Sequence, residues 1–260
     1  MRLFIDDKPC EAEPGQTLLE VAEQNGLSIP HLCHHEAMPN RACCRLCIVE
    51  VIDSHNNGTV VVSCTYPAKA GLKVYTATDK VIRLRSLLLS LLKEQAPAAE
   101  GKLVDYYEEY GAVSYNLQFN VKADEKCILC GLCTKACELL GNNAIQTAQR
   151  GINKKVSTAF DEPSEDCIGC AACARTCPTG NIECIEKRAG VTGESSSAFH
   201  VGYPTTRTIW GKTFMLVNCA SCGKPYATAE ELTWLKARLL DTDLNLDYCP
   251  KCRGKASVNS

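Results

Sequence analysis

CILCGLCTKAC, residues 127–137, places four cysteines at the spacing C-x2-C-x2-C-x3-C. The same spacing returns in CIGCAACARTCP, residues 167–178. Three thiolates this close together wrap one cubane, and the fourth thiolate of each run reaches the cluster of the other run. The two runs therefore predict two [4Fe–4S] clusters. Their predicted ligands are Cys127, Cys130, Cys133 and Cys177 for cluster one, and Cys167, Cys170, Cys173 and Cys137 for cluster two.

Both runs contain a glycine between ligands. Gly131 and Gly169 are predicted to let the backbone approach each cluster closely, so that its amides can donate to sulfur. Two interleaved zinc sites are the alternative, but the spacing suits a tetrahedral zinc ion poorly. The doubled run resembles the bacterial dicluster ferredoxins, with Glu138 in place of the usual proline in the first run. Residues 121–190 are accordingly predicted to form a 2×[4Fe–4S] ferredoxin-like domain.

A second cysteine-rich stretch lies upstream, in HLCHHEAMPNRACCRLC, residues 31–47. A [2Fe–2S] cluster needs four thiolates, usually three from one loop and one from a distant strand. The cysteine after the strand-like TVVVS supplies the distant thiolate. Within the loop we choose Cys44 over Cys43, because Cys44 forms a C-x-x-C pair with Cys47. The predicted [2Fe–2S] ligands are Cys33, Cys44, Cys47 and Cys64.

Histidines in the same loop raise the alternative of a Rieske centre, in which two histidines replace two cysteines. Such a centre needs two separate Cys–His pairs. Here His34 directly follows Cys33, and there is no second pair. The loop histidines are therefore predicted to lie near the cluster without binding it; they are His31, His34 and His35.

Short alternating segments surround this loop. RLFI, residues 2–5, predicts the first strand of a hairpin, and Asn57-Gly58 predicts the turn of a second hairpin. Thr17-Leu-Leu-Glu20 is a capping box, and Gly26 is placed to end the helix that follows it. A mixed sheet wrapped over one helix is the β-grasp pattern, which we predict for residues 1–78.

The segment between the two cluster regions is predicted to be a helical linker, residues 79–120. KVIRLRSLLLSLLKEQ, residues 80–95, has apolar side chains at a helical period and ends before Ala96-Pro97. The simplest role for this helix is to pack on the sheet or on a partner subunit.

The stretches IPHLCHH, CCRLCIVEV and SCTYPAKAGLKVYT carry a wider resemblance. They resemble the N-terminal region of the large iron–sulfur subunit of NADH dehydrogenase, and the diaphorase subunit of NAD-reducing hydrogenases, over residues 1 to about 95. In that family a further [4Fe–4S] cluster, bound by one histidine and three cysteines, follows this region. Here no cysteine lies between Cys64 and Cys127, and no histidine lies between His55 and His200. That cluster is predicted to be absent.

Two more C-x-x-C pairs follow a Gly/Ser/Thr-rich linker, residues 191–212, and flank a helix that Thr228 is predicted to cap. Four thiolates in two such pairs form a tetrahedral site, which favours structural zinc. The pattern also resembles rubredoxin, so one redox-active iron is the alternative. Residues 213–260 are predicted to form a small zinc-ribbon/rubredoxin-like module. Its predicted metal ligands are Cys219, Cys222, Cys249 and Cys252.

Composition limits the remaining possibilities. The chain has 260 residues, 19 cysteines and a formal net charge of −2, and it lacks the basic footprint of a nucleic-acid-binding protein. We expect no signal peptide and no transmembrane segment, and a reducing cytoplasm suits so many metal-bound thiolates. Cysteines outside the ligand sets are predicted to be buried apolar thiols; they are Cys10, Cys43 and Cys184.

Together these features predict an α+β electron-relay subunit of a multisubunit oxidoreductase. It would carry one [2Fe–2S] cluster, two [4Fe–4S] clusters and one zinc. By resemblance, it would pass single electrons between a flavin- and NAD(H)-binding subunit and at least one further redox subunit. One alternative is a free-standing ferredoxin-like electron carrier. The other is an enzyme in its own right, against which the lack of nucleotide-binding motifs argues.

Overall fold

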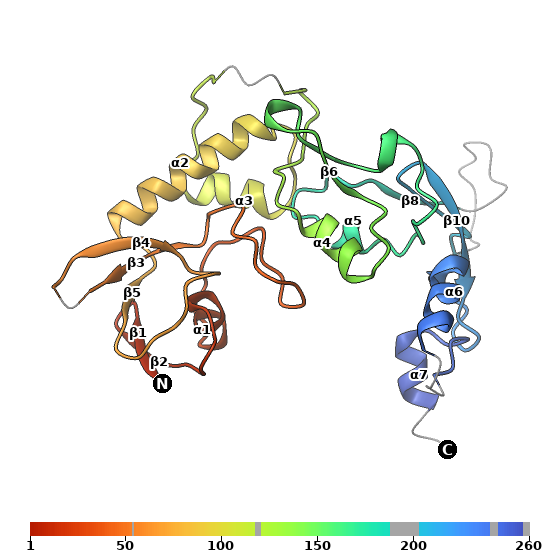
Figure 1. Ribbon diagram of the computed structural model, residues 1–260, viewed down its shortest axis with the longest axis horizontal. Coiled ribbons are helices and arrows are strands. Elements are labelled where there is room, and N and C mark those ends of the chain that lie inside the picture. The colour runs from red at the N-terminus through yellow and green to blue at the C-terminus, as the bar shows by residue number, and fades with distance from the viewer. Residues whose placement is uncertain (54, 118–120, 188–202, 240–243, 257–260) are drawn as a thin grey trace, which may run out of the picture. The chain divides into compact units, whose positions relative to one another are not determined.

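The computed structural model describes residues 1–53, 55–117, 121–187, 203–239 and 244–256 (Figure 1). The chain folds into two units that alternate along the sequence. Unit 1 comprises residues 1–135, 149–155 and 176–181, and unit 2 comprises residues 136–148, 156–175 and 182–260. The stretch expected to be one dicluster domain is therefore divided between the two units.

A five-stranded mixed sheet forms the N-terminal part of unit 1. Its strands are β1 (Arg2–Ile5), β2 (Lys8–Glu11), β3 (Ile48–Ile52), β4 (Gly58–Val62) and β5 (Lys73–Tyr75). They follow the order β2-β1-β5-β3-β4, in which only β1 and β5 are parallel. Helix α1 (Leu18–Gln24) packs on the sheet and buries Leu3, Ile5, Leu19, Val21, Val49 and Val74. The expected mixed sheet over one helix is confirmed.

Local signals in this sheet are largely confirmed. Thr17 caps α1 through the Glu20 amide, while the Glu20 carboxylate accepts from the Thr17 amide. Gly26 follows the C-cap at φ +69°, where a residue without Cβ is favoured. The β3–β4 hairpin also forms, but Gly58 pairs with Ile52 as the first residue of β4. Its turn therefore precedes the position that the Asn-Gly pair predicted.

Two helices follow the sheet. They are α2 (Asp79–Gln95) and α3 (Lys102–Glu109), so the helix expected over residues 80–95 is confirmed, and residues 110–117 are not helical. A second core of unit 1 joins these helices to both cysteine regions of the unit, through Leu32, Leu46, Leu89, Leu103, Ile128 and Leu132. The linker helices are thus part of the packing that surrounds the cysteines.

The cysteine runs are built on short elements. These are α4 (Leu132–Leu139), β6 (Gln146–Ala148), β7 (Lys155–Ser157), α5 (Ala172–Arg175) and two single 3-10 turns, Gly151–Asn153 and Ala159–Asp161. Such short helices suit a fold in which loops supply most of the thiols.

A four-stranded antiparallel sheet dominates unit 2. Its strands are β8 (Cys184–Lys187), β9 (Thr206–Ile209), β10 (Lys212–Asn218) and β11 (Pro225–Thr228), in the order β11-β10-β9-β8. Helix α6 (Ala229–Arg238) lies along β10, and α7 (Pro250–Ala256) follows it (Figure 1). Residues 191–202 of the expected linker, residues 191–212, lie outside the described residues, but its last part forms β9 and the first residue of β10.

No helix in the described part of the chain has the length and apolar character needed to span a lipid bilayer.

Candidate iron–sulfur and metal centres

The first group of thiols comes from the loop before β3 and from the end of β4. Each is at most 6 % exposed; they are Cys33, Cys44, Cys47 and Cys64. Hydrogen bonding with Cys44 lowers the pKa of Cys33 to about 6, and hydrogen bonding with Cys64 does the same for Cys47. The pKa of Cys64 is raised by its bond with Cys47, by burial and by the nearby sulfurs of the other two thiols. The structure therefore brings the four predicted [2Fe–2S] ligands together.

A buried hydroxyl beside these thiols tests whether the site fits a cluster. Ser63 is fully buried, and among the described residues its Oγ has no hydrogen-bond partner in standard geometry. It nevertheless lies close enough to Cys47 to lower the pKa of that thiol. A buried donor without an acceptor is costly, whereas the sulfurs of a cluster accept such bonds. The four thiols, as iron ligands, and the Ser63 hydroxyl, as a hydrogen-bond donor to sulfur, both fit an iron–sulfur cluster.

The neighbouring cysteine behaves differently. Cys43 is exposed, and its Sγ lies 3.6 Å from the carbonyl oxygen of Arg41. The amide of Cys44, by contrast, donates to Cys33 Sγ over 3.3 Å. The expectation that Cys43 is a buried thiol is wrong, because the loop turns its side chain outward.

The loop histidines have partners away from the thiols. His34 Nδ1 lies 2.5 Å from Asn40 Oδ1, and His34 Nε2 lies 3.6 Å from a Glu23 carboxylate oxygen. His31 Nδ1 lies 2.9 Å from the Ile29 carbonyl oxygen. These contacts hold the two histidines against Ile29, Asn40 and Glu23, and their not binding the cluster stays a prediction.

A buried arginine supports the same loop from helix α2. Arg85 is 1 % exposed, and it donates to the carbonyl oxygens of Leu46 and Ile48 over 3.0 and 2.8 Å. Those two residues flank Cys47. Burial lowers the pKa of Arg85, while the Tyr110 hydroxyl, 3.3 Å away, opposes that shift.

The second group of thiols also lies within unit 1. It consists of Cys127, Cys130, Cys133 and Cys177. Burial, with a smaller contribution from the neighbouring thiols, raises the pKa of Cys130 and of Cys133 to about 12. Backbone amides already point at two of the sulfurs: Leu129 donates to Cys127 over 3.4 Å, and Asn181 donates to Cys177 over 3.3 Å. The expected set for cluster one is therefore assembled, with donors in place.

One glycine of this set packs on the first cysteine loop. Gly131 has φ +78°, and a Cβ at that position would lie 3.2 Å from Arg41 Nη1. The same Arg41 nitrogen lies 3.5 Å from the Gly131 carbonyl oxygen. Cys33, Cys44 and Cys130 belong to one buried core. The two sets of unit 1 are therefore neighbours within a single packed structure.

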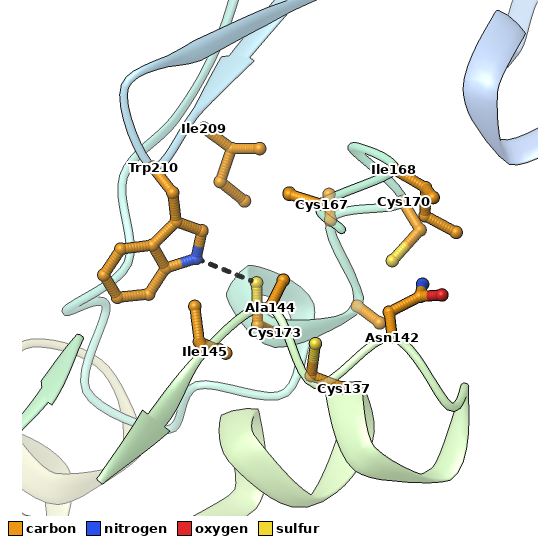
Figure 2. Close-up of a pocket in the computed structure, with 12 residues that line it drawn as sticks. Cys137, Asn142, Ala144, Ile145, Cys167, Ile168, Cys170, Cys173, Ile209 and Trp210 are labelled. Atoms are coloured by element: carbon orange, nitrogen blue, oxygen red, sulfur yellow. Dashed lines mark hydrogen bonds between the residues drawn. The ribbon is translucent and has the colours of Figure 1, made fainter. Parts of the chain in front are cut away.

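The third group of thiols lies in unit 2. Figure 2 shows the cysteine side chains around a common space, which Asn142, Ile145 and Trp210 also line. Burial raises the pKa values of Cys167 and Cys170, and it raises that of Cys173 to about 12. The structure thus brings together the set expected for cluster two, Cys137, Cys167, Cys170 and Cys173.

The fourth group of thiols is the tightest. All four sulfurs of Cys219, Cys222, Cys249 and Cys252 lie within 4.8 Å of one another. Four sulfurs around one zinc ion lie about 3.8 Å apart, given a zinc–sulfur bond of about 2.3 Å. The amide of Cys249 donates to Cys219 Sγ and lowers the pKa of that thiol to about 6. The group fits one metal ion.

Of the two remaining cysteines, only one is fully buried. Cys10 is 1 % exposed in the sheet core, as expected, whereas Cys184 is only partly buried on β8.

Comparison with known families confirms two kinds of iron–sulfur domain. Residues 1–79 match the family described as "2Fe-2S iron-sulfur cluster binding domain". Residues 126–181 match the family described as "4Fe-4S dicluster domain". Both matches include the expected cysteine runs, and neither covers the C-terminal thiols.

Similar proteins come from redox complexes. The chain is 30 % identical over 202 residues to "NADPH-Fe(3+) oxidoreductase subunit alpha" of Geobacter sulfurreducens, covering 69 % of this chain and 24 % of that protein. It is 28 % identical over 209 residues to a subunit of an NADH-quinone oxidoreductase of Rhizobium meliloti, covering 70 % and 24 %. A match to "NADP-reducing hydrogenase subunit HndD" of Solidesulfovibrio fructosivorans, 28 % identical, covers 70 % and 36 %. The chain thus spans between a quarter and about a third of these relatives.

A solved structure agrees with these similarities. A chain of an "NAD+-reducing [NiFe]-hydrogenase in the H2-reduced state" superposes with a TM-score of 0.61 and 28 % identity, covering 69 % of this chain and 85 % of that one. The resemblance to iron–sulfur subunits of NADH dehydrogenases and NAD-reducing hydrogenases is confirmed.

Proposed function

We propose that this chain is an electron-relay subunit of a multisubunit oxidoreductase. What carries the proposal is the convergence of three groups of four thiols, each matched to an iron–sulfur spacing. Iron–sulfur clusters bound there would accept and release one electron at a time. The relatives named above come from NAD(P)-linked complexes, which supports a flavin- and NAD(H)-binding subunit as one partner and a further redox subunit as another.

The proposed cofactors are one [2Fe–2S] cluster and two [4Fe–4S] clusters. The thiols of Cys33, Cys44, Cys47 and Cys64 would hold the first. Cys127, Cys130, Cys133 and Cys177 would hold cluster one of the [4Fe–4S] pair, and Cys137, Cys167, Cys170 and Cys173 would hold cluster two. The [2Fe–2S] thiols are buried and most thiols of the two [4Fe–4S] sets are partly buried, and amide donors such as Leu129 and Asn181 stabilise negative charge on sulfur.

The packing of unit 1 supports a relay without an intervening His-ligated cluster. Helices α2 and α3 bury the [2Fe–2S] ligand loop and the cluster-one loop in a single core. Arg41 joins the two loops directly, at Gly131. This shared packing supports direct transfer of electrons between the two ligand sets.

For the C-terminal site we propose structural zinc. The spacing of the four sulfurs suits one tetrahedral ion, and zinc is the usual occupant of a closed four-thiolate site. A rubredoxin-type iron is the alternative, because the same ligands would hold it.

Metal analysis of anaerobically purified protein tests the cofactors. We expect about ten irons, about ten acid-labile sulfides and about one zinc per chain. About eleven irons without zinc would make the C-terminal site a fourth redox centre. A chain with several zincs and few irons would refute the relay.

Purification from the native host separates the subunit from a free-standing carrier. A subunit should co-purify with a flavoprotein, so that the preparation contains flavin and reduces dyes with NADH or NADPH. A protein that elutes alone, fully loaded with clusters and without flavin, would favour the carrier.

A further inference from the structure

A hairpin outside the cysteine motifs covers the ligand loop of cluster two. The β9–β10 hairpin brings three donors onto residues 167–173. Arg207 Nη1 donates to the Gly169 carbonyl oxygen over 2.8 Å, and Lys212 Nζ donates to the Cys167 carbonyl oxygen over 3.0 Å. Trp210 Nε1 donates to Cys173 Sγ over 3.5 Å (Figure 2).

The contact between hairpin and loop is tight as well as polar. Gly169 has φ +69°, and a Cβ there would lie 2.6 Å from the Phe214 ring, so only glycine fits beneath β10. Thr228 at the end of β11 donates to the Ile168 carbonyl oxygen over 2.5 Å. Arg207 is itself 4 % exposed and paired with Glu186 over 2.7 Å. The sheet therefore packs tightly on the ligand loop of cluster two.

Trp210 occupies a backbone conformation that is unfavourable for its side chain. Trp210 and Gly211 form the two central residues of the hairpin turn, with φ +52° and +73°. Turns with two positive φ angles prefer Asn-Gly or Asp-Gly, because bulky side chains are strained there. Strain of this kind persists where the surroundings hold it, and it points to a role for the residue.

The role follows from what the indole can do. An indole N–H is a donor only, and here it points at a ligand sulfur. A donor to a cluster sulfur stabilises the form that carries more negative charge, which is the reduced form. We propose that Trp210 sets the reduction potential of the centre held by Cys137, Cys167, Cys170 and Cys173, raising it through this hydrogen bond. The inference rests on the proposed function.

Trp210→Phe in the full-length protein removes the N–H and keeps an aromatic ring. We expect about a tenfold fall in the ratio of reduced to oxidised cluster two at a fixed electrode potential, equivalent to about 59 mV for one electron. The measurement is a redox titration monitored by EPR. Cluster one, in the same sample, should keep its potential.

The chain offers a matched control in its second tryptophan. Trp234 on α6 has a buried Nε1 for which no hydrogen-bond partner is found among the described residues. Trp234→Phe therefore makes the same chemical change without removing a bond to sulfur. Its cluster potentials should equal those of the wild type.

A measurement on loaded protein guards against poor folding of the Trp210 variant. In the W234F protein, Trp210 is the sole tryptophan. Labelling its indole with ¹⁵N should give a ¹⁵N hyperfine coupling to reduced cluster two in pulsed EPR. Equal potentials in W210F and W234F, or no ¹⁵N coupling, would overturn the inference while leaving the relay intact. A wild-type chain without a second [4Fe–4S] signal would overturn both.

Discussion

Removing the buried arginine of α2 should loosen the [2Fe–2S] ligand loop. Arg85 donates to the carbonyl oxygens of Leu46, Ile48 and Thr76 over 3.0, 2.8 and 3.3 Å. Its guanidinium carbon also lies 4.9 Å from the centre of the Tyr110 ring. In Arg85→Met the side chain keeps much of its length and loses every donor. The carbonyl groups of Leu46, Ile48 and Thr76 would then lose this donor, and the first two of these bonds are buried.

The size of the effect follows from those three acceptors. Each carbonyl that loses its only side-chain donor costs about 1 kcal/mol, so the free energy of unfolding should fall by about 3 kcal/mol. Relief from burying an isolated charge works in the opposite direction. This gain is smaller than the loss of the hydrogen bonds, because the carbonyl groups that compensate the charge remain without a partner. The midpoint of thermal unfolding should fall by roughly 10 °C.

Differential scanning calorimetry of anaerobic, cluster-loaded protein measures this change. Arg83→Met is the matched control, since Arg83 is exposed on the same helix, and it should change the unfolding free energy by less than about 0.5 kcal/mol. Arg85→Lys should fall between the two, because an ammonium group keeps the charge without the fork of donors. If R85M and R83M melt together, the arginine does not support the loop and the argument fails.

Three further predictions concern other parts of the chain. Cys44→Ser should lose about two irons per chain and the visible circular dichroism of a [2Fe–2S] centre, whereas exposed Cys43→Ser should lose neither; equal losses would contradict the ligand choice. Cys222→Ser should remove the zinc and leave about ten irons, as plasma emission spectrometry can show, and loss of iron instead would favour a rubredoxin-type site. Tyr107→Phe should raise the free energy of unfolding by about 1 kcal/mol, since among the described residues the buried hydroxyl has no partner. Burial raises the pKa of Tyr107 to about 12, so the wild type should lose stability from pH 10 towards 12 while Y107F keeps it; parallel urea-unfolding curves across that range would contradict this.

Local spacing made much of this molecule predictable. The spacing C-x2-C-x2-C-x3-C involves only residues that are close together in the sequence, and Cys64 directly follows one strand-like segment. The structure brings each expected group of thiols together. The capping box at Thr17 and the apolar period of α2 are equally local, and both are confirmed. Such patterns are predictable because the structure they indicate depends on residues that are near one another in the sequence.

Contacts between residues far apart in the sequence could not be predicted from the sequence. Trp210 contacts a sulfur 37 positions earlier, and Arg85 contacts the Leu46 carbonyl 39 positions earlier. No periodicity relates such residues. A positive φ at a bulky residue is likewise invisible before folding, because Trp-Gly carries no strong turn signal. The outward turn of Cys43 was missed for the same reason, since the loop conformation decides it.

The alternation of the two units along the chain has a consequence for synthesis. The [2Fe–2S] ligand set is complete once Cys64 has been added to the chain. The set that begins at Cys127 is complete only at Cys177, after most of the second cysteine run, residues 167–178, has been made. At a synthesis rate of roughly 5–20 residues per second, three thiols of this set lack their fourth partner on the nascent chain for several seconds. With the ligands as proposed, both [4Fe–4S] sites close almost together, within the span from Cys173 to Cys177. A ribosome stalled before that span would therefore release a chain able to hold the small cluster and neither of the large ones.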